Sequence, residues 1–340
     1  MNQPNRILIF QTAFLGDVVL TLPLVQVLHR KFPAAEIDFL TTPRAAEIIR
    51  NHPAIHAVIE YDKRGNQRGL HGIVSIARAL RSTRYDVALV PHRSLRSAAV
   101  VALSGIPVRA GFDTSAGRFF LTDRVVYEKD FHEIERNLAF LNLFDLERPE
   151  KELPSIYPSN NDAGVIDKFL SDSKIDRNKK IVALAPGSVW NTKRWLPERF
   201  SELARKISDA GMAVVLVGGI EDEPLSREIT MSIANVVVAA GKLSILQSAE
   251  LLRRCKVLVT NDSAPLHMAV AVQTPVIAIF GATAPSFGFA PYGDRDVVVE
   301  TKGLPCRPCT IHGGSRCPIG TFECMMKISA DTVFDQVRQI

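Results

Sequence analysis

The stretch RILIFQTAFLGDVVLTLP, residues Arg6–Pro23, decides the fold of this chain. Its first part, Ile7–Phe10, is a continuous apolar run, which is typical of a parallel strand that is covered on both faces. Gln11 and Thr12 follow this run, and Asp17 closes the turn after them. Ligands of open α/β sheets bind at the carboxyl ends of the strands, so this turn is a candidate ligand site.

Asp17 has two interpretations on this stretch alone. In the first, its carboxylate lies at a strand end and faces a ligand. In the second, it only caps the helix expected over 21–31, because aspartate is favoured at helix N-termini.

Strands and helices alternate through the first 145 residues, which predicts a parallel sheet with helices on both faces. We expect strands over 6–11, 36–41, 56–60, 86–91 and 107–111, and helices over 21–31, 43–51, 70–82, 94–104 and 132–145.

The stretch 146–180 is polar and contains three prolines, so we expect a linker with one helix over about 162–172. A second α/β half then begins. Its expected strands are 181–185, 213–217, 236–239, 256–260 and 275–280, and its helices 197–210, 222–233, 244–254 and 264–272. Neither half has G-x-G-x-x-G after its first strand, which argues against a dinucleotide-dependent oxidoreductase.

Composition bounds the function further. The 340 residues suffice for two domains that each bury a core, and 46% hydrophobic with 23% charged residues is typical of a soluble globular protein. A net charge of +5 suits an anionic partner, but it is spread along the chain, which argues against nucleic acid. No apolar run of about 18 residues and no signal-peptide pattern are present, so we expect a cytoplasmic protein.

Two loops of the second half carry candidate ligand-binding residues. Ser188 and Lys193 follow strand 181–185 and suit phosphate oxygens; the alternative is a solvated loop from which Trp195 packs on the core. Glu221 follows strand 213–217, where a carboxylate suits ribose hydroxyls, although an acidic helix start explains it equally.

The strongest local signal follows strand 256–260. Asp262 and Ser263 stand where a helix N-terminus presents free N–H groups to an anion, and His267 lies further along the same helix. A single histidine on an apolar helix is usually structural, but three polar residues grouped at a strand end favour a site.

Four segments, in order, carry a resemblance that covers nearly the whole chain. They are GDVVLTLP (16–23), PGSVWNTKRWLPERF (186–200), LVGGIEDE (216–223) and TNDSAPLHMAVAVQTPVIAIFG (260–281). Together they resemble the ADP-heptose:lipopolysaccharide heptosyltransferase family, and within it the heptosyltransferase II branch most closely.

The resemblance implies a GT-B fold of two Rossmann-like domains: an acceptor-binding domain over 1–160 and an ADP-sugar-binding domain over 175–340, with a cysteine-rich tail over 303–327 and a linker over about 146–180. It implies inverting, metal-independent transfer of L-glycero-D-manno-heptose from ADP-heptose to the lipopolysaccharide inner core. The acceptor is then embedded in the cytoplasmic leaflet of the inner membrane, and we expect a peripheral, monomeric enzyme.

Residue roles follow from the same resemblance. Asp17 matches the catalytic carboxylate, which would act as general base toward the acceptor hydroxyl. The residues that match the donor-binding set are Ser188 and Lys193 at the diphosphate, Glu221 at the ribose, Leu243 at the adenine, and Asp262, Ser263 and His267 beside the phosphates and the sugar. Two positions depart from the family pattern: Ala264-Pro265 replaces a glycine, and Gln11 stands where some relatives have lysine.

Arg93 and Arg96 follow strand 86–91 and are candidates for the carboxylates and phosphates of an inner-core acceptor, since guanidinium suits such groups. Arginines scattered over the surface of a basic protein are the alternative.

Cys306, Cys309, Cys317 and Cys324 form a cluster that begins with C-x-x-C. Four thiolates permit a tetrahedral structural zinc site, with His312 as a competing ligand; the alternative is reduced thiols that pack a compact loop.

Two other function classes remain open on the sequence. A GT-B transferase for another nucleotide sugar or glycan acceptor would share the phosphate contacts. A zinc-bearing nucleic-acid binder would explain the charge and the cysteines, but it gives no reason for Asp17 or for the D-S-x-x-x-H segment, and the chain has few aromatic residues for base stacking.

Overall fold

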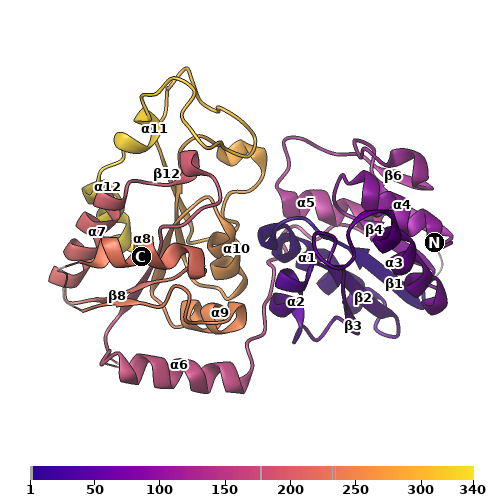
Figure 1. Ribbon diagram of the computed structural model, residues 1–340, viewed down its shortest axis with the longest axis horizontal. Helices are drawn as coiled ribbons and strands as arrows, with labels where there is room; N and C mark the ends of the chain where they lie inside the picture. The colour runs from indigo at the N-terminus through magenta and orange to yellow at the C-terminus, as the bar shows by residue number, and fades with distance from the viewer. Residues whose placement is uncertain (1–2, 177, 232, 234) are drawn as a thin grey trace. The chain divides into compact units, whose positions relative to one another are not determined.

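The computed structural model describes residues 3–176, 178–231, 233 and 235–340, and the chain divides into two compact units, Met1–Tyr157 and Pro158–Ile340 (Figure 1). Each unit is built on one six-stranded parallel sheet.

The first unit has the strand order β3-β2-β1-β4-β5-β6. Its central strand pairs on both sides, with Ile7 opposite Ile37 and Val87. The strands are β1 (Arg6–Phe10), β2 (Glu36–Thr41), β3 (Ala57–Glu60), β4 (Val87–Val90), β5 (Val108–Phe112) and β6 (Asp123–Val125). The helices are α1 (Leu15–Lys31), α2 (Pro43–Ile49), α3 (Gly69–Thr83), α4 (Leu95–Leu103) and α5 (Glu133–Leu138), with 3₁₀ turns at Arg118–Phe120 and Ala139–Phe144.

The second unit repeats this plan with the order β12-β11-β10-β7-β8-β9. Its strands are β7 (Ile181–Ala185), β8 (Ala213–Leu216), β9 (Val236–Val238), β10 (Val257–Asn261), β11 (Val276–Phe280) and β12 (Val297–Glu300). Its helices are α6 (Asn160–Asp172), α7 (Pro197–Asp209), α8 (Glu223–Thr230), α9 (Ile245–Arg253), α10 (Ala264–Ala271), α11 (Glu323–Met326) and α12 (Ala330–Gln339), with 3₁₀ turns at Asn191–Lys193, Ile220–Asp222 and Pro285–Phe287.

Helices cover both faces of each sheet. In the first unit α1 packs against α2 and α5, and α3 packs against α4. In the second, α7 packs against α8 and α12, and α9 packs against α6 and α10. When every crossover is right-handed, helices that connect strands on one side of the switch in strand order lie on one face, and those on the other side lie on the opposite face. The helix pairs above follow from this rule.

The cores are formed by the apolar runs that predicted the strands. All five residues of β7 and of β10 are buried, and Trp195 packs its ring edge-on against Phe200, with 5.0 Å between the ring centroids. Trp195 is 1% exposed and belongs to the core of the second unit.

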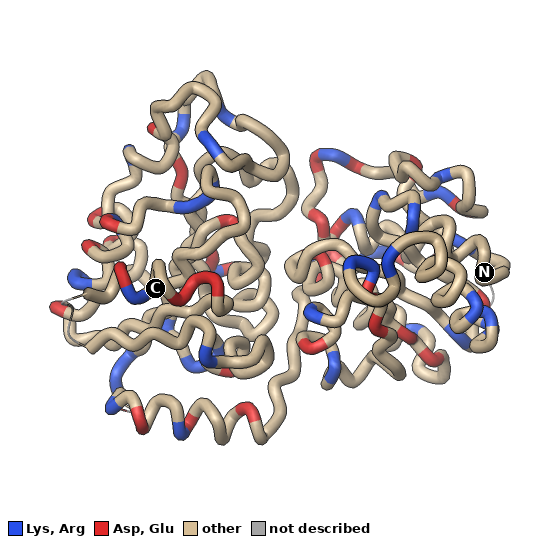
Figure 2. The backbone as a smooth tube through the Cα atoms, in the orientation of Figure 1, with Lys and Arg blue, Asp and Glu red and all other residues tan. Residues whose placement is uncertain are grey.

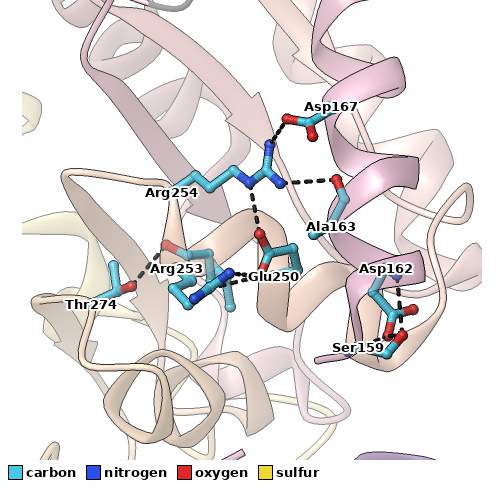
Figure 3. A network of polar contacts seen from close by, with 9 residues as sticks. Ser159, Asp162, Ala163, Asp167, Glu250, Arg253, Arg254 and Thr274 are labelled. Carbon is cyan, nitrogen blue, oxygen red and sulfur yellow. Dashed lines mark hydrogen bonds and ion pairs between the residues drawn. The ribbon is translucent and has the colours of Figure 1, made fainter. Parts of the chain in front are cut away.

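Helix α6 lies within the polar stretch expected as a linker, yet it is fastened to the second unit. Its first turn has a capping box, in which Ser159 N–H donates to Asp162 Oδ2 (2.8 Å) and Asp162 N–H donates to Ser159 Oγ (3.2 Å). Arg254, just after α9, donates to Ala163 O (2.9 Å) and to Asp167 Oδ1 (2.5 Å), as Figure 3 shows. Helix α6 therefore covers α9.

The structure corrects several expected boundaries. Helix α1 begins at Leu15, well before residue 21, so Asp17 lies in its first turn and not in a preceding loop. The helix expected over 132–145 is α-helical only to Leu138 and then tightens to a 3₁₀ turn. Strands β6 and β12 were not anticipated, because these edge strands are short and only partly buried. Helices α11 and α12 were not anticipated either.

Charged residues of both signs are interspersed over the described part of each unit, without a continuous block of lysine and arginine (Figure 2). No helix in the described residues is long and apolar enough to cross a membrane.

Candidate functional site

The strand order of each sheet reverses between its two central strands. In the first unit this switch point lies between β1 and β4, and in the second between β7 and β10. Ligands of open α/β sheets bind at the carboxyl ends of the strands on either side of such a point. The loops after these four strands carry most of the site residues expected from the sequence.

At the switch point of the second unit, the loops after β7 and β10 are joined by an ion pair. Lys193 Nζ lies 2.6 Å from Asp262 Oδ2, and the two side chains are 14% and 8% exposed. Thr283, just after β11, donates through Oγ1 to the same Asp262 Oδ2 (2.7 Å). The structure thus brings together two of the predicted donor-site residues and adds Thr283.

Asn261, the last residue of β10, fixes both ends of the loop after β7. Its Oδ1 accepts from Trp195 N–H (2.9 Å), and its Nδ2 donates to Pro186 O (2.8 Å). The side chain is fully buried. Asn261 therefore shapes the loop that presents Ser188 and Lys193.

Ser263 and His267 are placed differently on α10. Ser263 is the N-cap residue, half-buried, and its hydroxyl lies 3.4 Å from both Asn261 O and Thr260 Oγ1. Its side chain makes no capping hydrogen bond, so the first turn of α10 is not closed by it. His267 is only 5% exposed, which agrees with a largely structural position.

Ser188 is half-buried in the loop after β7, and its carbonyl oxygen accepts from Arg194 Nε (2.7 Å). This hydrogen bond joins the two ends of the segment from Ser188 to Arg194, which contains Lys193. Trp195 donates through Nε1 to Ile328 O (3.1 Å), so its ring packs within the core of the second unit.

The loop after β8 packs beside the loop after β7. Asp222 Oδ2 accepts from Gly219 N–H (3.0 Å), and a Cβ atom on Gly187 would lie only 2.1 Å from Asp222 Oδ1. A larger residue at position 187 would therefore displace the Asp222 carboxylate from this position. The exposed Glu221 precedes Asp222 on the same 3₁₀ turn.

Leu243 lies half-buried in the loop before α9. That loop is held against the Glu221 turn, because Gly241 N–H donates to Gly218 O (3.2 Å) and a Cβ on Gly241 would lie 2.8 Å from Ile220 Cδ1. The predicted ribose and adenine residues thus lie on neighbouring loops.

In the first unit, the structure confirms that Asp17 caps a helix. Its Oδ2 accepts from Phe14 N–H (3.0 Å) at the start of α1. Burial is the largest cause of the raised pKa of Tyr127; the negative charges of Glu133 and Asp17 raise it further, and Arg136 and Arg93 oppose them. The cap uses Oδ2 of the carboxylate.

Gln11 and Thr12, after β1, are buried and hydrogen-bonded. Gln11 Nε2 donates to Pro91 O (3.2 Å), and its Oε1 accepts from Ala13 N–H (3.1 Å). Thr12 O accepts from Lys63 Nζ (2.6 Å), and Thr12 Oγ1 lies 3.4 Å from His92 Nε2. Gln11 therefore braces the loops after β1 and β4.

His92 and Lys63 were not predicted as site residues. Burial, and then the charge of Lys63, lowers the pKa of His92 to about 3, so this ring is neutral. Burial also lowers the pKa of Lys63, and Arg64 and Arg96 lower it further. The position of His92 directly after an apolar strand was the available signal, whereas nothing in the local sequence distinguishes Lys63.

Arg93 and Arg96 make different contacts. Arg93 is exposed, and its guanidinium carbon lies 4.7 Å from the centre of the Tyr127 ring, as does that of Arg136. Arg96 donates through Nη1 to Lys63 O (3.0 Å). Arg93 in the loop after β4 and Arg136 on α5 thus flank Tyr127, and Arg96 on α4 contacts the backbone of Lys63.

Cys306, Cys309 and Cys317 are partly exposed and Cys324 is buried, and all four are free thiols. Within the described residues, no three Cys, His, Asp or Glu side chains are placed together as a ready metal-binding group.

Comparison with known proteins identifies the family. The sequence profile of glycosyltransferase family 9 (heptosyltransferase) matches residues 73–316, more than half of the chain. The chain belongs to this family. This glycosyltransferase is also 27% identical to lipooligosaccharide heptosyltransferase 2 of Haemophilus influenzae over 307 residues, which cover 87% of this chain and 88% of that relative.

Two solved structures share the fold of this glycosyltransferase. A glycosyltransferase family 9 protein of Veillonella parvula superposes with a TM-score of 0.86 at 23% identity, covering 98% of this chain and 96% of the other. ADP-heptose lipopolysaccharide heptosyltransferase II of E. coli superposes with a TM-score of 0.81 at 24% identity, covering 98% of each chain. The predicted GT-B fold class and the family resemblance are confirmed.

Proposed function

We propose that this glycosyltransferase transfers L-glycero-D-manno-heptose from ADP-heptose to the lipopolysaccharide inner core, with inversion and without a metal ion in the transfer step. The observation that carries the proposal is the arrangement at the switch points. The second unit presents Lys193, paired with Asp262, after its central strands, and the first presents Asp17 after β1. The relatives named as heptosyltransferases support the donor and the acceptor class.

In this proposal the second unit binds ADP-heptose. Lys193 stabilises the diphosphate, whose negative charge grows as ADP leaves. Ser188 and Ser263 offer hydroxyl donors to the phosphate oxygens, and Glu221 and Leu243 hold the ribose and the adenine. Asp262 and His267 border the phosphates and the sugar.

The first unit binds the acceptor. Asp17 takes the proton from the acceptor hydroxyl as its oxygen attacks the anomeric carbon, and ADP departs from the opposite face of the sugar. Arg93 and Arg96 attract the anionic groups of the acceptor. One displacement of this kind inverts the anomeric configuration.

The test measures transfer of heptose from ADP-heptose to an inner-core acceptor from which the transferred heptose is missing. NMR of the product then gives its anomeric configuration. Asp17→Asn retains an oxygen that can accept from Phe14 N–H, so the helix cap and the melting temperature should persist. We expect kcat to fall by about 100-fold or more, as loss of a general base predicts, while ADP binding is unchanged. The matched control is Asp130→Asn, an exposed carboxylate of the same unit.

Full activity of Asp17→Asn would reject the base assignment. Turnover of a UDP-sugar in preference to ADP-heptose would favour the other GT-B transferase. A requirement for added Mg²⁺ would reject metal-independent transfer.

A further inference from the structure

Helix α3 buries one face in the first unit and exposes apolar and basic side chains on the other. Ile76, Ala77 and Leu80 belong to the core. Leu70 is 81% exposed, and Val74 is exposed as well. Side chains three or four positions apart lie on the same side of a helix, so one exposed stripe runs along α3. Its members are Leu70, Val74, Arg78 and Arg81.

The stripe continues into a basic loop. Arg64 and Arg68, just before α3, are also exposed. In all, residues 63–84 hold six lysine or arginine residues and no aspartate or glutamate. Within the part of the chain that the structure describes, none of these six cations is paired with a carboxylate. Their charges therefore add up to a local positive field, in a unit that mixes both signs over most of its length (Figure 2).

The two acidic residues that flank this stretch are occupied by backbone groups. Asp62 accepts from Gly65 N–H (2.9 Å) through Oδ1 and from Asn66 N–H (3.0 Å) through Oδ2. Asp86 Oδ2 accepts from Arg6 N–H (2.9 Å). The six cations between these carboxylates are thus left to attract an anionic partner.

The loop before α3 lies at the carboxyl ends of the central strands. Lys63 Nζ donates to Thr12 O just after β1 (2.6 Å), and Lys63 O accepts from Arg96 Nη1 (3.0 Å) on α4. Thr12 belongs to the loop that leads to Asp17. The exposed cations at the start of α3 therefore border the sheet edge that the proposed function assigns to the acceptor.

We propose that six residues of this region, the α3 surface, dock the protein on a bilayer that carries anionic lipids. They are Arg64, Arg68, Leu70, Val74, Arg78 and Arg81. The arginines are attracted by the negative potential of such a bilayer, and Leu70 and Val74 insert at the boundary between the headgroups and the acyl chains. The docking itself stands apart from the proposed function. Its consequence, that a lipid-borne acceptor is brought to the edge at Asp17, rests on that function.

The composition of the α3 surface favours a lipid bilayer over other partners. A second copy docked through the same surface would place arginines opposite arginines, which is unfavourable. Single-stranded nucleic acid is bound through aromatic side chains, and the six residues of the α3 surface include none. A free phosphate ion gives no reason for two exposed aliphatic side chains between Arg68 and Arg78.

Sedimentation of the full chain with sucrose-loaded vesicles tests the docking. We expect binding to vesicles of phosphatidylcholine mixed with phosphatidylglycerol, weaker binding to phosphatidylcholine alone, and a decline as NaCl screens the charges. The double variant Arg78→Gln/Arg81→Gln should bind about 20-fold more weakly, at about fivefold per charge removed. Leu70→Ser should bind about tenfold more weakly. The melting temperatures should not change, because these side chains are exposed.

Two matched controls separate the position of the arginines from their chemistry. Arg205→Gln/Arg338→Gln removes the same charge from exposed positions of the second unit and should bind like the unaltered protein. Arg78→Lys/Arg81→Lys keeps the charge and should also bind normally, since a bilayer attracts charge and does not require the fixed fork of donors of arginine.

Failure to bind the anionic vesicles would overturn the docking surface, and so would equal losses in Arg78→Gln/Arg81→Gln and in the second-unit control. Loss of binding in the lysine variant would also overturn it, because it would show a site for one specific anion. Tighter binding of a DNA duplex than of the vesicles, with the same loss in the glutamine variant, would assign the surface to nucleic acid instead.

Heptose transfer tests the consequence separately. On an acceptor embedded in the anionic vesicles, Arg78→Gln/Arg81→Gln should raise KM by about tenfold and leave kcat unchanged. Both parameters should stay normal on the same acceptor without its acyl chains. An equal rise of KM on both acceptors would show that these arginines bind the glycan, and it would overturn the role of the bilayer. If no heptose is transferred at all, the proposed function fails, while vesicle binding still decides the docking.

Discussion

Lys193 and Asp262 form a nearly buried ion pair, with 2.6 Å between Nζ and Oδ2, although 69 positions of sequence separate the two residues (262 − 193). The pair joins the loops that follow the two central strands of the second sheet. It fixes the position of the lysine side chain.

Removal of one partner of this pair should destabilise the second unit strongly. Asp262→Asn leaves the lysine charge uncompensated in a site of low exposure, and such losses cost about 3–5 kcal/mol. Lys193→Met should cost a similar amount, and the double variant should recover part of it. Urea unfolding of the single and double variants measures the coupling.

The matched control is the exposed pair of Lys168 and Asp172, whose side chains are 76% and 64% exposed. Its double-mutant cycle should give a coupling of about 0.5 kcal/mol or less. Equal coupling energies in the two pairs would contradict the expectation that burial strengthens the pair of Lys193 and Asp262.

Replacement of Asn261 by alanine should loosen the loop after β7. The change leaves Trp195 N–H and Pro186 O without their partner, and each unsatisfied buried group costs about 1–3 kcal/mol. We expect a loss of about 2–5 kcal/mol in the free energy of unfolding and a weaker affinity for ADP in calorimetry. The control Asn160→Ala changes an exposed asparagine of the same unit and should leave the stability and the ADP affinity unchanged. A normal ADP affinity in Asn261→Ala would show that the loop after β7 does not need the hydrogen bonds of Asn261.

Acidification should destabilise the first unit through His52. Its Nδ1 accepts from Ala54 N–H (3.2 Å), its Nε2 has no partner, and burial lowers its pKa from 6.5 to about 4. The folded state therefore binds a proton less readily than the unfolded state. The contribution of neutral His52 to the free energy of unfolding is complete above pH 6.5. It is lost as the pH falls toward 4, and the loss is about 3 kcal/mol at most.

The variant His52→Asn keeps an acceptor near the position of Nδ1 but cannot titrate. Its melting temperature should fall less between pH 7 and pH 4 than that of the unaltered protein. The exposed His71 provides the control, because His71→Gln should not change the pH dependence. Parallel curves for His52→Asn and the unaltered chain would refute the assignment.

Arg254 should determine whether α6 stays docked. Its guanidinium bonds Asp167 and Ala163 O on α6 and the buried Glu250 on α9, whereas Arg253 bonds only Glu250 in this network (Figure 3). Arg254→Ala should therefore raise hydrogen exchange across α6 and cost about 2 kcal/mol. Arg253→Ala should leave the exchange of α6 unchanged, and equal protection of α6 in both variants would contradict the prediction.

The alternation of apolar runs was enough to predict the two parallel sheets, because strands buried on both faces leave a strong local pattern. Edge strands such as β6 and β12 were missed because they are short and only partly buried, so they leave no such pattern. The start of α1 was also missed, since Gly16 and the polar residues before it resemble a loop.

The positions of the site residues after central strands were predictable, but their contacts were not. Nothing local shows that Asp262 pairs with Lys193, or that Lys63 reaches Thr12 across the first sheet. These contacts depend on which strands are neighbours, and strand order is a property of the whole fold. The roles of Asp17 and of the donor-site residues remain predictions.

The separation between a buried scaffold and its loops has a consequence for how such an enzyme changes over time. Strands β7 and β10 contain no charged residue and are wholly buried, while Ser188, Lys193 and Asp262 stand in the connections behind them. In the proposed donor site, a substitution at the half-buried Ser188 can alter which sugar or nucleotide is accepted without repacking the interior. A substitution of Lys193 or Asp262 also breaks their ion pair, so selection at these two positions acts on folding and on substrate choice together.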